Sequence, residues 1–85
     1  ELVEAIRKTP WIQTIKALEL IKIAGELAVM VDVASMDKDV SILLEFSEST
    51  WGDLSPALEA IVKSSDAKAL YLDATYKDKI VIRNK

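Results

Sequence analysis

The chain has 85 residues, 51% of them hydrophobic, and its eleven basic and fourteen acidic residues give a net charge of −3. It contains neither histidine nor cysteine, so it lacks the commonest general base, the thiol nucleophile, disulfide bonds and the usual zinc ligands. The acidic balance argues against a nucleic-acid or anionic-membrane surface, because phosphate groups bind to basic faces. We therefore expect one domain, residues 1–85, stabilised by an aliphatic core.

The first residues predict a short amphipathic helix over residues 1–8, with Leu2, Val3 and Ile6 on one side. Thr9-Pro10 follows and is typical of a new helix start, with threonine as the N-cap and proline at the first helical position.

The segment after Pro10 predicts a second, longer helix. Its polar residues recur at every third position, and apolar residues fill the places between them over a wide arc. The polar residues are Gln13, Lys16, Glu19 and Lys22. We expect this helix to be largely covered and to run to about Ala24, with Gly25 as the stop.

The hydrophobic period then changes to two, which predicts strands. A short polar loop between two alternating runs indicates a β-hairpin, and Ser55-Pro56 predicts the N-terminus of a third helix. The expected elements are a strand over residues 27–34, a strand over 40–47, a helix over 55–65, and further strands over 69–76 and 80–83.

These elements predict an α/β (α+β) fold with the order α-α-β-β-α-β-β. We expect one four-stranded sheet, mixed or antiparallel, with the helices packed on one face and a crossover from strand 40–47 through helix 55–65 to strand 69–76. The predicted core consists of Ile15, Leu18, Val31, Ile42, Leu44, Leu58, Ile61 and Leu72.

The best metal-like pattern has oxygen-bearing residues at positions 1, 3, 5, 9 and 12 of an EF-hand-like count. They are Asp37, Asp39, Ser41, Glu45 and Glu48. Position 6 requires glycine for a sharp turn but is Ile42 here, so the pattern indicates a polar hairpin loop instead. We assign no metal site.

Other chemistry is equally unsupported. Asp32, Glu45 and Asp73 share the strand face opposite the apolar one, but an open face does not exclude water from paired carboxylates. Tyr71 and Arg83 on that face are too few for a stacking platform that binds nucleic acid. The chain has no glycine-rich phosphate loop. We therefore predict no enzyme activity, no cofactor and no catalytic residue.

Apolar residues on the outer sheet face are the remaining functional signal. Met30, Leu43, Tyr71 and Val81 fall on that face, and Trp51, next to Gly52 in a predicted loop, is hard to bury completely. Apolar groups gathered on an open face commonly mark a protein partner or self-association. We expect neither nucleic acid nor a membrane as a partner.

Two hypotheses about function follow. The first is a stably folded α/β scaffold without catalytic activity, designed or extensively redesigned, because the two glycines and two prolines lie at element boundaries and free cysteine is absent. The alternative is a small protein–protein interaction module that uses the open sheet face or an edge strand. Glu1-Leu2-Val3-Glu4 resembles neither a signal nor a transit peptide, so we expect a soluble, cytoplasmic chain if it is natural.

Overall fold

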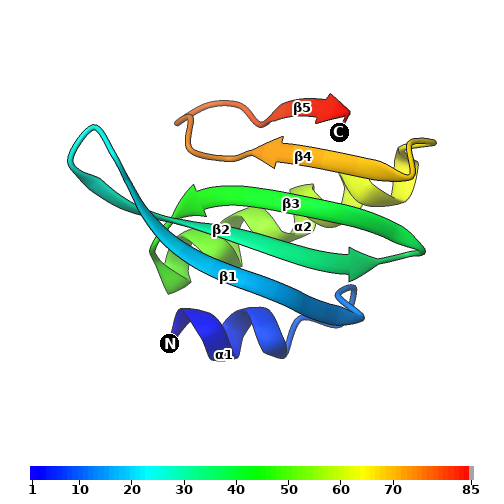
Figure 1. Ribbon diagram of the computed structural model, residues 1–85, viewed down its shortest axis with the longest axis horizontal. Coiled ribbons are helices and arrows are strands. Elements are labelled where there is room, and N and C mark those ends of the chain that lie inside the picture. Colours follow the sequence, from blue (N-terminus) through cyan, green and yellow to red (C-terminus); the bar gives the residue numbers. More distant parts are fainter. Residues whose placement is uncertain (85) are drawn as a thin grey trace.

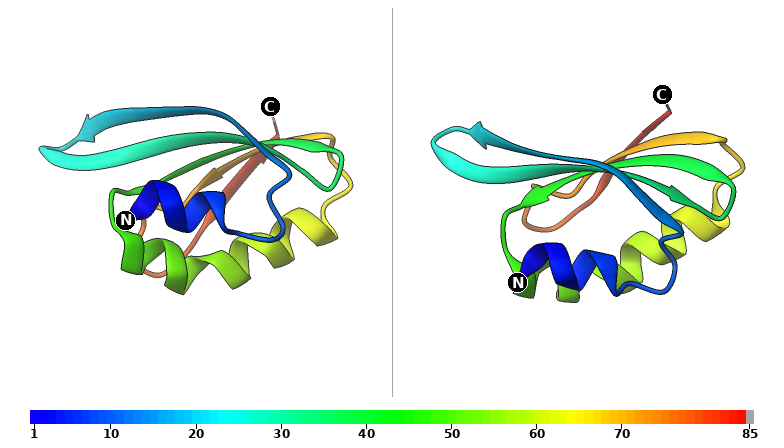
Figure 2. Two further views of the ribbon diagram at one scale, coloured as in Figure 1. Left: turned by 90° about the horizontal axis from the view of Figure 1, so that it is seen from below. Right: turned by 60° about the horizontal axis from the view of Figure 1, so that its bottom comes forward.

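The computed structural model describes residues 1–84 and consists of two layers, a five-stranded sheet and two helices that lie against one of its faces (Figures 1 and 2). In chain order the elements are α1 (Leu2–Arg7), β1 (Thr14–Ile23), β2 (Glu26–Ser35), β3 (Lys38–Glu45), α2 (Glu48–Ser64), β4 (Ala69–Asp73) and β5 (Val81–Asn84).

The strands lie side by side in the order β1-β2-β3-β4-β5. All neighbours are antiparallel except β3 and β4, which are parallel and joined through α2. The α+β class, the hairpin of β2 and β3, the crossover through α2 and the placement of both helices on one face are confirmed. The order is α-β-β-β-α-β-β, so the expected four-stranded sheet and the second helix are wrong.

The segment after Pro10 forms β1, and β-branched residues concentrated in it favour a strand. A register shift lies between Ile15, which is opposite Val33, and Ala17, which is opposite Asp32. Such a bulge changes the face to which each later residue points. Polar residues at every third position therefore fit a bulged edge strand as well as they fit a helix.

Both hairpins of the first three strands have two-residue turns with positive φ at each central residue. The values are 51° at Ala24 and 83° at Gly25, and 52° at Met36 and 63° at Asp37. Positive φ at both positions defines a type I′ turn, whose twist matches that of the flanking strands. Gly25 is thus a turn residue of β1–β2 rather than the end of a helix.

Helix α2 begins at Glu48, seven residues before the predicted start at 55. Ser47 is the N-cap, and its side chain accepts a hydrogen bond from the Thr50 backbone N–H at 3.3 Å. Pro56 lies inside the helix, where it cannot donate to the carbonyl of Gly52. Both residues are exposed, so water can bind that carbonyl.

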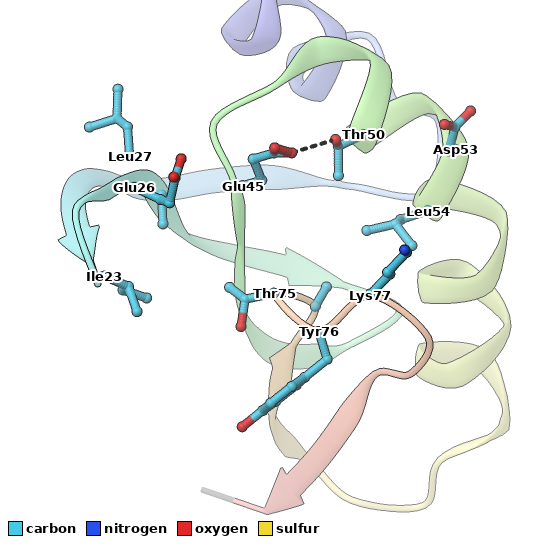
Figure 3. A pocket seen from close by; sticks show the side chains of 12 residues that line it. Ile23, Glu26, Leu27, Glu45, Thr50, Asp53, Leu54, Thr75, Tyr76 and Lys77 are labelled. Carbon is cyan, nitrogen blue, oxygen red and sulfur yellow. Dashed lines mark hydrogen bonds between the residues drawn. The ribbon is translucent and has the colours of Figure 1, made fainter.

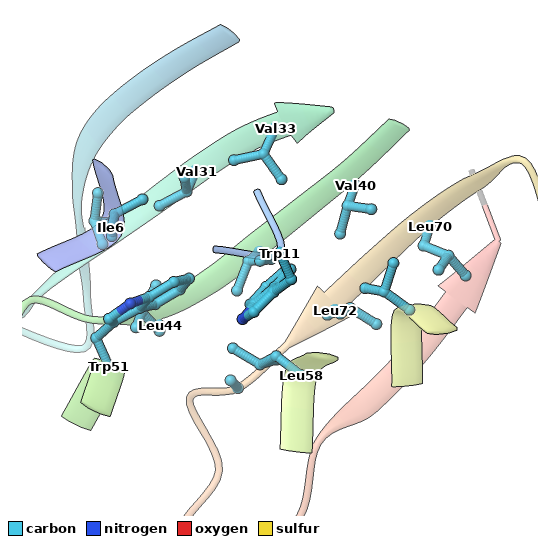
Figure 4. Packing of buried hydrophobic residues seen from close by; sticks show 14 of the residues in the cluster. Ile6, Trp11, Val31, Val33, Val40, Leu44, Trp51, Leu58, Leu70 and Leu72 are labelled. Carbon is cyan, nitrogen blue, oxygen red and sulfur yellow. The ribbon is translucent and has the colours of Figure 1, made fainter. Parts of the chain in front are cut away.

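The core lies between the sheet and the helices (Figure 4). Five predicted members are buried: Val31, Ile42, Leu44, Leu58 and Leu72. Ile15 and Ile61 are partly buried against the core. Leu18 is exposed, so its assignment to the core is wrong, and Trp51, expected to resist burial, is only 2% exposed.

Trp51 is buried because it lies on the same face of α2 as Leu58 and Val62, at helical spacings of seven and eleven residues. Strand β4 is shorter than the predicted 69–76, since residues 74–80 form the connection to β5. Strand β5 has the predicted length of four residues and begins one residue later than predicted.

The two glycines are expected to respond in opposite directions to substitution by alanine. In both cases an added Cβ meets no atom within 4 Å, so the change in stability should depend only on the backbone conformation at that position. Gly25→Ala places a side chain at positive φ and should lower the free energy of unfolding by about 1 kcal/mol. Gly52→Ala in α2 should raise it by up to about 1 kcal/mol. Urea denaturation followed by circular dichroism measures both, and equal signs would contradict the backbone argument.

Leu44→Ala is expected to be more damaging than Leu43→Ala. Leu44 is fully buried between the sheet and the helices, whereas Leu43 is 6% exposed and is covered only by neighbours on the outer face. Loss of the Leu44 side chain should lower the free energy of unfolding by about 2–5 kcal/mol. Denaturant titration of both variants tests this, and a larger loss for Leu43→Ala would show that the outer face carries more of the stability.

Candidate interaction surface

The five residues of the EF-hand-like pattern are spread along one strand and beyond it. Asp37 lies in the β2–β3 turn and Glu45 at the far end of β3. Over the described residues, no three or more acidic side chains are grouped so that they could hold a metal ion.

The three carboxylates that the sequence placed on one sheet face are held by different neighbours. Asp32 accepts a hydrogen bond from the Ser41 hydroxyl, and Glu45 accepts one from the Thr50 hydroxyl at 3.2 Å. Asp73 accepts bonds from the backbone N–H and hydroxyl of Thr75, at 3.0 and 2.6 Å. These contacts are local structural ones, and they do not bring the carboxylates together as an acid–base pair.

The outer sheet face carries the predicted apolar residues. Met30 is opposite Leu43, Tyr71 is opposite Arg83, and Val81 is opposite Asp73. These positions alternate with core residues, so they lie on the face away from the helices. None of the apolar ones is among the exposed large hydrophobic residues, because they are covered by their neighbours on adjacent strands. The outer face therefore offers less exposed apolar surface than the sequence suggests.

The strongest apolar exposure lies instead on the helix side of the β1–β2 hairpin. Leu18 and Leu20 of β1 are opposite Val31 and Val29, which belong to the core. The hairpin extends past the helices (Figure 2), so its distal part is uncovered on this side. We call the exposed set there the hairpin shelf; it comprises Leu18, Leu20, Leu27 and Phe46.

Phe46, two residues after the buried Leu44, is the member of the shelf that lies outside the strands. It follows β3, and its backbone N–H donates to the carbonyl of Leu27 at 3.1 Å, so it lies at the hairpin end of the sheet. Helix α2 begins two residues later, and Phe46 remains 42% exposed.

The free edge of β1 presents unpaired backbone groups next to the shelf. In a two-residue type I′ hairpin the residues flanking the turn, here Ile23 and Glu26, form a hydrogen-bonded pair, and such pairs alternate along the ladder. The N–H and C=O groups of Leu18, Leu20 and Lys22 therefore point away from β2, toward the free edge.

A hollow of about 370 Å³ lies beside this edge, between α1 and β1. Figure 1 shows that α1 lies beyond the β1 edge of the sheet, and Figure 2 places it in the helix layer. Four of the six lining residues are apolar, and Arg7 and Gln13 add a comparable polar surface. The apolar ones are Val3, Ile12, Ile15 and Leu18.

A larger hollow of about 650 Å³ lies between the tip of the β1–β2 hairpin, the start of α2 and the β4–β5 connection (Figure 3). Glu26, Glu45 and Asp53 contribute three carboxylates, and Lys77 one ammonium group. The hollow is widely open, and the only hydrogen bond drawn between the lining side chains is that of Thr50 to Glu45.

The position of α1 depends on a buried polar and aromatic cluster. Trp11 and Trp51 stack with their ring centroids 5.9 Å apart. The Trp51 indole N–H donates to the Thr9 hydroxyl and the Trp11 indole N–H to the Ser55 hydroxyl, both at 3.0 Å. The Ser35 hydroxyl donates to the Trp11 carbonyl. These contacts fasten the segment after α1 to both α2 and β2.

Comparison of the chain with protein-family models, with curated proteins and with solved structures found no match. In the part of the chain that the structure describes, no helix is both long and apolar enough to cross a membrane.

Sequence reasoning missed the β1 edge because it interpreted that segment as a helix. Only Leu18, Glu19 and Leu20 alternate cleanly, and Ile21 and Lys22 break the pattern before the Ala24-Gly25 turn, so the sequence signal for a strand is weak. The exposure of the shelf, in contrast, depends on how much of the sheet the helices cover, and a local sequence pattern cannot predict this.

Thr9→Val is expected to lower the free energy of unfolding by about 1–3 kcal/mol, because a buried indole N–H then lacks its acceptor. The Thr9 hydroxyl also donates to the Ala5 carbonyl at 2.8 Å, and valine removes this bond too. Thr9→Ser keeps the hydroxyl and is the matched control, expected to retain most of the stability. Urea unfolding monitored by tryptophan fluorescence measures both variants, and equal losses would show that the hydrogen bonds contribute little.

Proposed function

We propose that the chain is a non-catalytic α+β domain that binds another polypeptide by strand addition at the free edge of β1. The observation that carries this proposal is the coincidence of outward-pointing backbone groups with exposed leucines on a ten-residue edge strand. Strand addition uses main-chain hydrogen bonds for affinity and side-chain pockets for selectivity.

The two edges of the sheet differ in a way that favours β1. Strand β5 spans four residues, whereas β1 spans ten and contains no proline. Long edge strands with apolar side chains pair readily with further strands, and short ones do not. The Lys16 ammonium is engaged by the Asp39 carboxylate and is directed toward β3 on the outer face, away from the free edge.

An added strand would find apolar surface on its helix side. Alternate side chains of the strand would lie next to Leu18 and Leu20 of the shelf, and those near the start of β1 would reach the smaller hollow. Val3 of α1 lines that hollow and would contact such a side chain. The partner segment is thus an extended one with alternate apolar residues.

A second candidate is a scaffold with no partner, designed or extensively redesigned. Among residues 1–84, every buried side-chain nitrogen or oxygen has a hydrogen-bond partner, and both early turns have the type that hairpins prefer. Agreement between turns, packing and polar partners is what design aims for. For either candidate we propose the cytoplasm as the compartment, since a chain without cysteine needs no oxidising environment.

Selection of a random peptide library on the immobilised domain, followed by NMR with the best peptide, tests the binding proposal. We expect the largest amide shift changes and slowed hydrogen exchange at Leu18, Leu20 and Lys22, because an added strand bonds to their backbone groups. Shift changes confined to Tyr71 and its neighbours on the outer face would contradict strand addition at β1. Failure to select any peptide would favour the scaffold.

Leu20→Asp and Ile82→Asp form a matched pair for this test. Their side chains are 58% and 51% exposed, and they lie on opposite edge strands. The aspartate at position 20 should weaken peptide binding by tenfold or more, on the order of one hot-spot contact. The aspartate at position 82 should leave binding unchanged, and equal weakening would contradict a role for the β1 edge.

A further inference from the structure

We infer that the polypeptide bound at the β1 edge is a second copy of this chain, paired antiparallel through β1 with Leu20 at the two-fold axis. The inference rests on the proposed function, which requires only that some strand adds there. The pairing would join two five-stranded sheets into one continuous sheet with all the helices on the same side.

The backbone of β1 is self-complementary about Leu20. Its outward-pointing groups belong to Leu18, Leu20 and Lys22, which are evenly spaced with Leu20 in the middle. An antiparallel partner centred on Leu20 therefore places Leu18 opposite Lys22 of the partner subunit and Leu20 opposite its own copy. Each of these residues then forms backbone N–H···O=C hydrogen bonds with a partner residue whose N–H and C=O groups also point to the free edge.

The side chains favour the same register. Around the axis, Glu19 is opposite Ile21 of the partner subunit, so no two like charges are directly opposed. On the helix side the exposed leucines at position 20 meet each other, and Leu18 lies beside the aliphatic stem of the partner's Lys22. The shelves of the two copies thereby become neighbours, and the surface of Leu20, 58% exposed in one copy, is covered.

Neighbouring registers are less favourable. Moving the centre to Glu19 brings two carboxylates directly opposite each other, and like charges so placed are destabilising. Moving it to Ile21 puts Leu18 opposite Ala24 of the partner's turn, where the strand has ended. Moving it to Leu18 brings the bulge between Ile15 and Ala17 into the paired region.

Single-cysteine variants test the register directly, because the chain itself has no cysteine. Directly opposed residues of a hydrogen-bonded antiparallel pair have Cα atoms about 5.5 Å apart, which suits a disulfide. Leu20→Cys should therefore cross-link to its own copy under mild oxidation. Glu19→Cys is diagonal to its copy at about 7–8 Å, beyond the usual Cα range of a disulfide, and should cross-link poorly.

Ile82→Cys on the opposite edge is the control for random collision, since its exposure is similar. We expect Leu20→Cys to cross-link at least about tenfold faster than this control, given the raised local concentration in a specific pair. The unmodified chain should also show a concentration-dependent monomer–dimer equilibrium in sedimentation, shifted at least about tenfold toward monomer by Leu20→Asp.

Three results would overturn the inference. They are a monomer at every concentration, equal rates for positions 20 and 82, or faster cross-linking at position 19 than at position 20. None of them disproves strand addition itself, because a selected peptide that shifts the amides of Leu18 and Leu20 would still place a different partner at this edge. Failure of the peptide experiment together with a monomeric chain would remove both proposals.

Discussion

The stacked pair of Trp11 and Trp51 is the contact on which the arrangement of the layers depends. One ring comes from the segment between α1 and β1 and the other from the first turns of α2, and hydroxyl groups of Thr9 and Ser55 take up both indole N–H groups. Aromatic rings bury large areas, and indole N–H groups need partners when buried. This cluster therefore joins the start of the chain to its middle and sets where α1 can lie.

Because α1 is fastened to α2 through that segment, it lies beyond β1 and leaves a space beside the edge strand. The two helices together are too narrow to cover five strands, and the hairpin of β1 and β2 extends past them. The same geometry thus produces the hollow, the shelf and the accessible edge. The hollow, the shelf and the edge are adjacent and all result from the placement of the helices, so together they form a single candidate interaction site.

Strands whose alternation is clean, such as β2 and β3, could be predicted from the sequence, as could the crossover through α2. Strand β1 could not, because its bulge between Ile15 and Ala17 disturbs the period of two, and Thr9-Pro10 imitates a helix start. Ser55-Pro56 likewise indicated a helix start at the wrong place, since α2 begins earlier with Ser47 as its N-cap. Burial of Trp51 and exposure of Leu18 depend on tertiary contacts that distant residues make.

The parallel pairing of β3 with β4 has a consequence for how the chain folds. The first three strands meet through tight turns, so their contacts are local in sequence and close at little entropic cost. The β3–β4 contacts form only after residues 46–68 have been brought back across the sheet. Closure of that long loop is the slow step in such a topology, and until it happens the edge of β3 is as open as that of β1.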